Sequence, residues 1–591
     1  MNSNRIRDLR PSLPYAFGIR EFQEFAKARP SRRRPSLRFF VLATALTGLL
    51  LAFGGTIRAQ QSTPLPHLAR NHGATQIIVD GKPFLVRGGE LENSSASSLS
   101  YMETVWPKVA AMHFNTVLAP VYWQLIEPQE GKFDFATVDG LIQGARKHNV
   151  RLVLLWFGTW KNSMSCYVPD WVKQDQHRFP RAVRADGTSL EILSALSPNN
   201  LSADSSAFVA LMQHLRKMDS ADHTVIMVQV ENEVGMIPDA RDHSAAADSA
   251  FMSPVPAELT AYLSKNRDSL EPTLKQAWET HGTKVGANWP DTFSSGPATD
   301  ELFTAWTEAH YTGEIAARGK QVYPLPMYVN AALIRPGKLP AQYPSGGPLP
   351  HLFDLWRSAA PAIDFFSPDL YFPNFVEWAD RYARPRNPLF IPESGRADAA
   401  ELAANAFYAY GQLISMGYSV YAPEFLKPEE QQTLGHAYAV IDQLTPLILA
   451  NQGTGHMVGI RMPSNFDGAV DLAPQQFTLG GYTFMVHFRE PAPISVGAKV
   501  EPEIPGAHGG VVIQMGPDDF IVAATGMVLT FATHGERGTL AGIDSIWEGN
   551  FVNGVWKPGR ELNGDDDNQG RHLRMPAGEF TIRRIRLYRY H

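Results

Sequence analysis

Cysteine and the common cofactor motifs are almost absent from this sequence. Cys166 is the single cysteine among 591 residues, which excludes an intramolecular disulfide and a cysteine-rich metal site. No Walker A loop and no glycine-rich dinucleotide fingerprint follows a strand-like run. The 18 histidines show no HExxH or other metal-binding spacing. We therefore expect no nucleotide cofactor and no metal ion.

Long apolar runs are also scarce. One apolar run, residues 39–53, follows a cluster of arginines and precedes a small-residue site that ends at Ala59. The run is shorter than the ~20 residues that a membrane-spanning helix needs. This order of charged, apolar and cleavage regions is typical of a secretory signal. We expect residues 1–59 to be a signal peptide cleaved near Ala59, and the protein to be periplasmic or secreted without a stable membrane anchor. An uncleaved anchor is the alternative, and the export route stays open.

Positive charge is concentrated in that first segment. Residues 1–59 contain eleven Lys or Arg and three Asp or Glu, a net charge of +8, whereas the whole chain carries −6. The remainder therefore carries −14. An acidic exported protein repels nucleic acids and anionic membranes, so neutral polymers are the expected partners.

The middle of the chain alternates between short apolar runs and helical periodicity. After a polar linker over residues 60–75, residues 76–450 show eight such units, which predicts a (β/α)8 TIM barrel. A small hairpin over residues 76–84 should precede the barrel. The expected strands are residues 84–90, 115–123, 151–157, 224–230, 325–331, 363–371, 388–393 and 418–424. The expected helices are residues 101–112, 135–148, 202–219, 301–318, 351–359 and 398–416. The longest insertion, residues 238–299, follows the fourth strand and is expected to lie over the site.

Helical periodicity stops near residue 451. Residues 451–591 contain short apolar runs between Gly, Pro and Asp turns, which predicts a C-terminal all-β domain with a sandwich-like fold. This domain is expected to brace the barrel, with glycan binding as the alternative.

Two predicted strands end in glutamate. Residues 224–230 form a β-branched run that leads into Glu231, Asn232 and Glu233, and the seventh run ends at Glu393. Chemistry in such barrels takes place at the carboxyl ends of the strands. Two carboxyls about 5–5.5 Å apart can cleave a glycosidic bond with retention of configuration. The alternative for the first group is a polar strand end that faces solvent.

These motifs resemble the clan A glycoside hydrolases. Residues 229–235 (QVENEVG) and 117–135 (VLAPVYWQLIEPQEGKFDF) are similar to family 35, the β-galactosidases. Residues 87–95 and 160–171 resemble a bacterial branch with a C-terminal domain of the DUF5597 type. Some members of that branch remove galactose from xyloglucan side chains.

The resemblance implies roles for individual residues. Glu233 matches the family's acid/base, which must hold a proton and therefore needs a raised pKa. Glu393 matches the nucleophile, and Glu424, at the end of the eighth strand, is its main rival. Asn232 matches the amide that binds the sugar 2-hydroxyl. Glu231 is expected to support its neighbours, or to pair with a buried cation such as Arg87.

Strand position suggests further substrate-binding residues. Glu90 follows the first strand, and a salt bridge or a surface position is its alternative. Trp160 and Trp378 are candidates for stacking on a sugar face, and packing in the core is the alternative for each. A Tyr at the end of the sixth strand often holds the nucleophile in this clan. The substrate-binding candidates are Asn232, Glu90, Trp160, Asn162, Asn330 and Tyr371.

The expected function is that of a retaining exo-β-galactosidase acting on plant-type oligosaccharides or polysaccharides. Two alternatives remain open. One is another clan A glycosidase, such as a β-glucosidase, an arabinosidase or an endo-glycanase. The other is a barrel that binds carbohydrate without catalysis.

Overall fold

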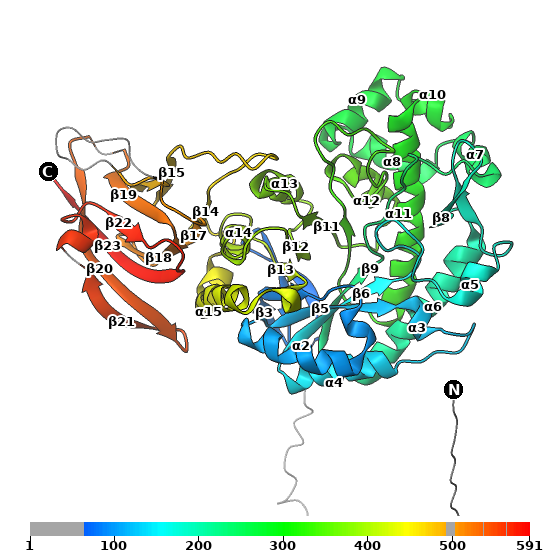
Figure 1. Cartoon of the computed structure of the whole chain (residues 1–591). Coiled ribbons are helices and arrows are strands. Elements are labelled where there is room, and N and C mark those ends of the chain that lie inside the picture. Colours follow the sequence, from blue (N-terminus) through cyan, green and yellow to red (C-terminus); the bar gives the residue numbers. More distant parts are fainter. Residues whose placement is uncertain (1–63, 492–502, 536, 563) are drawn as a thin grey trace, which may run out of the picture. The chain divides into compact units, whose positions relative to one another are not determined.

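Eight parallel strands and the helices that follow them form a barrel in the computed structural model (Figure 1). The structure describes residues 64–491, 503–535, 537–562 and 564–591, so the expected signal peptide lies outside the described residues. Within the described ranges, no helix combines the length and the apolar character that a membrane crossing requires. The predicted (β/α)8 architecture is confirmed.

The barrel strands pair in the order β12-β11-β10-β9-β6-β5-β4-β13. A parallel bridge between Ile391 and Tyr418 joins the two ends and closes the cylinder. The strands are β4 (Val86–Glu90), β5 (Thr116–Tyr122), β6 (Arg151–Phe157), β9 (Val225–Val230), β10 (Met327–Ala331), β11 (Phe365–Leu370), β12 (Glu393–Ser394) and β13 (Gly417–Tyr421). Most of their residues are fully buried, as expected of parallel strands covered on both faces.

One main helix follows each strand. These helices are α2 (Leu99–Ala111), α4 (Ala136–Lys147), α6 (Pro198–Asp219), α11 (Pro297–Val322), α12 (Phe353–Ala359), α13 (Phe375–Tyr382), α14 (Ala399–Gly411) and α15 (Pro428–Asn451). Asp398 caps α14 as predicted, because its side chain accepts a hydrogen bond from the Glu401 amide.

Three expectations about these elements were wrong. The seventh strand is shorter than residues 388–393, because Pro388 and Pro392 cannot donate to a strand ladder. The linker over 60–75 contains β1 (His67–Asn71), which pairs with β2 (Ala74–Val79) of the predicted hairpin; β3 (Lys82–Phe84) completes that sheet. The helix α14 stops at Gly411, five residues before the expected end.

Two connections carry extra elements. The third unit contains α5 (Asp170–Gln174), β7 (Arg181–Val183) and β8 (Ser189–Leu193), and α3 (Trp123–Ile126) precedes α4. The insertion after β9 contains α7 (Ala245–Phe251), α8 (Ala257–Lys265), α9 (Pro272–Thr280) and α10 (Trp289–Phe293). Phe251 and Trp289 pack edge-on against Phe303 of α11, which anchors the insertion to the barrel. Its influence on substrate choice stays a prediction.

The C-terminal domain consists of two antiparallel sheets, as predicted. One has the order β14-β17-β18-β23-β20-β21 and the other β15-β16-β19-β22. Their strands are β14 (Met457–Arg461), β15 (Gln475–Leu479), β16 (Tyr482–His487), β17 (Gly509–Gln514), β18 (Asp519–Thr525), β19 (Met527–Thr533), β20 (Leu540–Val552), β21 (Val555–Leu562), β22 (Leu573–Met575) and β23 (Thr581–Tyr590). A shared core that includes Val522 and Phe484 lies between the sheets.

The other face of the six-stranded sheet joins the core of the barrel. Val511 and Ile513 of β17 belong to the same buried cluster as Phe407 of α14. A side chain at Gly411 would come within 2.9 Å of the Gly459 backbone, so glycine permits this close contact. The packing agrees with a bracing role for the domain.

Candidate active site

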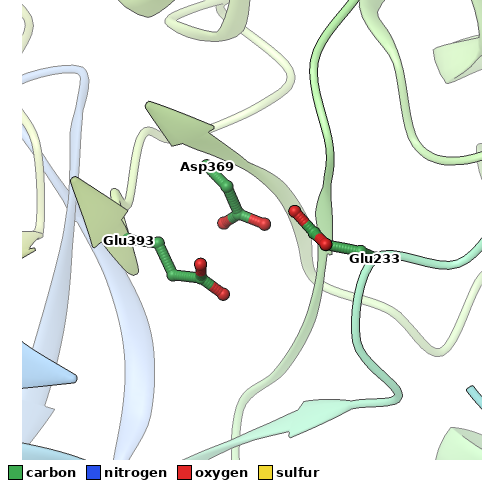
Figure 2. A group of neighbouring side chains, drawn as sticks. All are labelled: Glu233, Asp369 and Glu393. Atoms are coloured by element: carbon green, nitrogen blue, oxygen red, sulfur yellow. The ribbon is translucent and has the colours of Figure 1, made fainter. Parts of the chain in front are cut away.

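The polar residues of the site lie at the carboxyl ends of the barrel strands. β9 runs directly into Glu231, Asn232 and Glu233, while β12 starts at Glu393. Side chains from β9, β11 and β12 meet at one point, where the carboxylates of Glu233, Asp369 and Glu393 face one another (Figure 2). A carboxylate oxygen of each lies within 4.8 Å of those of the other two.

This geometry distinguishes Glu393 from Glu424, the alternative candidate for the nucleophile. The Glu424 carboxylate accepts hydrogen bonds from the Ser95 hydroxyl at 2.7 Å and from the Glu92 amide at 3.0 Å, and it is not part of the three-carboxylate group. Glu424 therefore fixes the loop after β4. Glu393 is the glutamate that faces Glu233.

Three side chains donate hydrogen bonds to Glu393. Tyr371 donates its hydroxyl to Oε2 at 2.6 Å. Asn232 and Asn330 each donate an amide N–H to Oε1 at 3.3 Å. Glu393 is 3% exposed, so these donors fix the orientation of a buried carboxylate. Asn330 and Tyr371, predicted from strand position, and Asn232, predicted from the family resemblance, thus converge on this group.

Asn330 connects the three carboxylate residues. Its Nδ2 donates to Asp369 Oδ2 at 2.7 Å as well as to Glu393, and its Oδ1 accepts the Glu233 backbone N–H at 2.9 Å. One amide at the end of β10 therefore sets the relative position of Glu233 after β9, Asp369 on β11 and Glu393 on β12.

Glu233 differs from Glu393 in its surroundings. Its side chain is partly exposed, whereas Glu393 is buried. Removal from water, together with the negative charge of Glu393, raises the pKa of Glu233 to about 7. A carboxyl with this pKa holds a proton near neutral pH, which is the property that an acid/base needs.

Two more acidic side chains border this group. Glu90 at the end of β4 is fully buried, and neither of its carboxylate oxygens has a hydrogen-bond donor. Burial and the charge of Glu393 raise the pKa of both Glu90 and Asp369 well above their usual values. Asp369 was missed by the sequence analysis, because it lies inside the predicted sixth strand without any motif around it.

Lys161 is the other residue that the sequence analysis missed. This lysine is 6% exposed and donates to Asn232 Oδ1 at 3.0 Å. It also donates to the side-chain oxygen of Asn162. Its positive charge lowers the pKa of Glu233, of Glu90 and of Asp369, against the larger effect of burial. Lys161 therefore balances part of the negative charge in the site.

The structure corrects the prediction for Trp160. Its ring is completely buried and packs edge-on against Tyr311 at 4.8 Å, so it cannot stack on a sugar face. The core alternative is correct because the turn after β6 directs the ring inward. The neighbouring Asn162 is exposed and stays a candidate for sugar binding. Trp378, on the buried face of α13, is 5% exposed, so core packing describes it as well.

The suggested pairing of Glu231 with Arg87 is also wrong. Arg87 pairs with Asp442 at 2.6 Å, on the side of α15. Glu231 lies beside another carboxyl group, that of Asp204 in α6. Glu231 and Glu233 both have positive φ angles, 63° and 45°, so the chain turns sharply at this point and the two side chains diverge.

The three-carboxylate group is also where a cation could bind among the described residues. Its donor set suits a different ligand. Glu393 is already bound by one hydroxyl and two amide N–H groups, and the ammonium group of Lys161 lies close by. A calcium site would need six to eight oxygen ligands free of such donors. Carboxylates interleaved with amides fit the hydroxyl groups of a sugar better.

Comparisons with known proteins cover two parts of the chain. Residues 97–294 match the glycoside hydrolase 42 model, described as Beta-galactosidase, and residues 434–574 match DUF5597, described as a domain of unknown function. A curated beta-galactosidase from Xanthomonas manihotis is 27% identical over 216 residues, which are 36% of this chain and 34% of that protein. The chain thus spans about a third of the length of this curated relative.

The similar solved structures have lower sequence identity to this chain. Beta-galactosidase from Bacillus circulans sp. alkalophilus has a TM-score of 0.41 and 16% identity over 62% of this chain and 57% of its own. Beta-mannanase from the blue mussel Mytilus edulis has a TM-score of 0.37 and 13% identity over 64% of this chain and 96% of its own. Both are too distant for any functional inference.

Proposed function

We propose that this protein is a retaining β-galactosidase, with Glu233 as acid/base and Glu393 as nucleophile. One observation carries the proposal: carboxylate oxygens of the two residues lie within 4.8 Å of each other at the mouth of the barrel. Retaining glycosidases place their two carboxyls about 5–5.5 Å apart, whereas inverting enzymes need about 6.5–9.5 Å to admit a water molecule.

In the first step, Glu393 attacks the anomeric carbon and forms a covalent glycosyl ester. The Glu233 carboxyl donates its proton to the departing glycosidic oxygen, so the aglycone leaves as a neutral alcohol. The raised pKa of about 7 keeps that proton available. Tyr371, Asn232 and Asn330 hold Glu393 in the orientation needed for attack.

In the second step, Glu233 acts as a base. It removes a proton from water, and the resulting nucleophile attacks the same anomeric carbon and releases Glu393. The product sugar keeps the β configuration of the substrate. Glu233 regains its proton, and the site returns to its starting state.

The substrate class rests on the sequence. The resemblance of the residues around Glu233 to family 35, the glycoside hydrolase 42 match and the curated beta-galactosidase all support galactose as the sugar removed. Glu90 and Asp369 supply buried acceptors that suit the hydroxyl groups of a bound sugar. We propose that the substrate is a plant-type oligosaccharide, from which the enzyme removes a terminal galactose outside the cytoplasm.

A panel of nitrophenyl glycosides tests this proposal. We expect release from the β-galactoside, and proton NMR should show β-galactose as the first product. Release only from a β-glucoside, an α-L-arabinoside or a β-mannoside would overturn the choice of sugar. An α anomer as the first product would overturn the retaining mechanism. Binding of galactose without turnover of any glycoside would favour a non-catalytic barrel.

A further inference from the structure

A second pair of carboxyl groups lies behind the proposed catalytic pair. Glu231, at the end of β9, and Asp204, in α6, are both completely buried. Oxygens of both carboxyl groups lie around the same point beside Gly158, and the hydrogen bond between the two groups contributes to raising the pKa of Glu231. Two ionised carboxylates in contact would repel each other strongly in a buried position, so one of them must carry a proton.

The surrounding donors indicate which group carries it. Asp204 accepts hydrogen bonds from Trp156 Nε1 at 2.9 Å, from the Thr159 amide at 3.1 Å and from the Tyr311 hydroxyl at 3.4 Å. Glu231 Oε2 accepts a hydrogen bond from the Trp160 amide at 2.6 Å, the Thr159 amide that donates to Asp204 also lies close to it, and Oε1 has no donor. An oxygen without a donor beside an ionised carboxylate that accepts several hydrogen bonds is the natural position for the shared proton.

Gly158 allows the two groups to meet. A side chain at this position would place its Cβ 2.3 Å from Trp156 Nε1, 2.7 Å from Glu231 Oε1 and 2.8 Å from Asp204 Oδ1. Even a methyl group would therefore push the two carboxyl groups away from their present positions. Glu231 Oε1 and Asp204 Oδ1 therefore both face Gly158.

The pair joins two turns that carry the proposed active site. Trp160 donates its amide to Glu231, and its carbonyl accepts the Asn232 amide at 3.2 Å. On the same two turns, Lys161 donates to the Asn232 side chain, and Ser163 donates to the Glu233 carbonyl at 2.9 Å. The turn after β6 is thus fixed to the turn after β9 at four points.

Both turns contain residues in a conformation that side chains disfavour. Glu231 and Glu233 have φ angles of 63° and 45°, and Asn162 and Ser163 have angles of 52° and 59°. Left-handed residues other than glycine persist where surrounding contacts determine them, and they cluster at functional sites. The buried pair is well placed to supply such contacts.

We propose that Glu231 and Asp204 form a hydrogen-bonded carboxylic acid–carboxylate pair, with the proton on Glu231, that positions Asn232 and Glu233 by locking the turn after β6 to the turn after β9. Glu231 and Asp204 are positioning residues, since neither carboxyl group belongs to the three-carboxylate group at the barrel mouth. The effect on catalysis rests on the proposed function, whereas the location of the proton does not.

Amide substitutions separate the two partners. Glu231→Gln keeps an acceptor for the Trp160 amide and gains an N–H donor towards Asp204, so it mimics a protonated Glu231. Asp204→Asn leaves one acceptor oxygen for the Trp156, Thr159 and Tyr311 donors. We expect the melting temperature of Glu231→Gln to stay within about 1 °C of wild type and that of Asp204→Asn to fall by roughly 2–4 °C or more. Equal losses, or a larger loss for Glu231→Gln, would overturn the location of the proton.

Activity tests the positioning role. On a galactoside with a poor leaving group, we expect Asp204→Asn to lower kcat by about 10²-fold through misplacement of Glu233, and Glu231→Gln to stay within about threefold of wild type. On a dinitrophenyl galactoside, which departs without acid assistance, the loss in Asp204→Asn should be much smaller. An equal loss on both substrates would overturn positioning of the acid.

A third variant covers the case in which Asp204→Asn does not fold. Gly158→Ala should reproduce the same dependence on the leaving group, because its methyl group would displace the two carboxyl groups and the Trp156 N–H that donates to Asp204, without removing a polar atom. Full activity of Gly158→Ala on the poor leaving group would overturn the proposal. If the wild-type protein cleaves no glycoside, the proposed function fails, and the melting temperatures still decide where the proton lies.

Discussion

Glu233 and Glu393 are connected through a single side chain, that of Asn330. The Asn330 amide accepts the backbone N–H of Glu233 and donates to the carboxylate of Glu393, while oxygens of the two carboxylates approach within 4.8 Å. Asn330 comes from β10, which pairs with β9 on one side and β11 on the other. The order of strands in the barrel therefore fixes the distance on which the proposed chemistry depends.

Replacement of Glu233 should remove the general acid while the site still binds substrate. We expect Glu233→Gln to reduce kcat on a galactoside with a poor leaving group by about 10²–10⁴-fold, the usual contribution of a general acid. Substrate binding should change little, which isothermal titration with galactose can measure. Glu424→Gln is the matched control, because Glu424 is a buried glutamate outside the three-carboxylate group. A larger loss for Glu424→Gln than for Glu233→Gln would contradict the assignment.

The pH dependence of kcat/KM follows from the raised pKa of Glu233. The acid must be protonated in the free enzyme, so activity should fall as the pH rises through about 7. Lys161 lowers this pKa, so Lys161→Met should move the fall in activity to higher pH. Lys173→Met, which removes a lysine that contacts the Gln124 side chain, should leave the profile in place. A shift of the profile to lower pH in Lys161→Met would refute the electrostatic account.

The raised pKa of Glu233 should also make the stability of the folded protein depend on pH. A carboxyl whose folded pKa is raised from 4.5 to about 7 favours the folded state at low pH and loses that contribution as the pH rises between these values. Glu233→Gln removes the titrating group. The variant should therefore melt at a higher temperature than wild type at pH 8, and the difference should disappear near pH 4. Calorimetry at the two pH values measures this, and a variant that is less stable at pH 8 would contradict it.

The hydroxyl group of Tyr371 should matter more for turnover than for binding. Tyr371→Phe leaves Glu393 Oε2 without its 2.6 Å donor. Loss of such a donor to a buried group costs about 1–3 kcal/mol, so kcat should fall by roughly 5–150-fold with KM little changed. Tyr421→Phe is the control, because that ring touches Tyr371 but its hydroxyl bonds to Asn93. Equal effects of the two variants would remove the special role of Tyr371.

The expected export signal leads to a separate prediction. A host that secretes the full chain should release a protein whose N-terminus lies close to Gln60, since the predicted cleavage site ends at Ala59. N-terminal sequencing of the periplasmic and culture fractions measures this. An unprocessed chain that stays with the membrane fraction would favour the uncleaved anchor.

Strand positions were the most predictable part of the fold. Short β-branched runs such as residues 225–230 specify buried parallel strands, and their carboxyl ends specify where polar side chains meet. For this reason the sequence alone predicts that Glu233, Glu393, Asn330 and Tyr371 lie at this end of the barrel. The helices α13 and α15 were both missed. The second follows a strand end rich in prolines and carries Pro446 within it.

Side-chain direction in the turns was not predictable. Trp160, Lys161 and Asn162 are adjacent in the sequence, yet the ring is buried, the ammonium group faces the site and the amide is exposed. Asn162 and Ser163 in this turn have positive φ angles, which the sequence does not indicate because neither residue is glycine. Asp369 was not predicted for a related reason, since only the closed barrel brings it beside Glu233 and Glu393, which are distant in the sequence.

Covalent trapping tests the central claim most directly. A 2-deoxy-2-fluoro-β-galactoside with a dinitrophenyl leaving group should form a glycosyl ester that turns over slowly, and peptide mass spectrometry then identifies the labelled residue. We expect the label on Glu393, 160 positions along the chain from Glu233. A label on Glu424 or any other residue would contradict the account, as would turnover of this reagent with inversion and no labelled peptide.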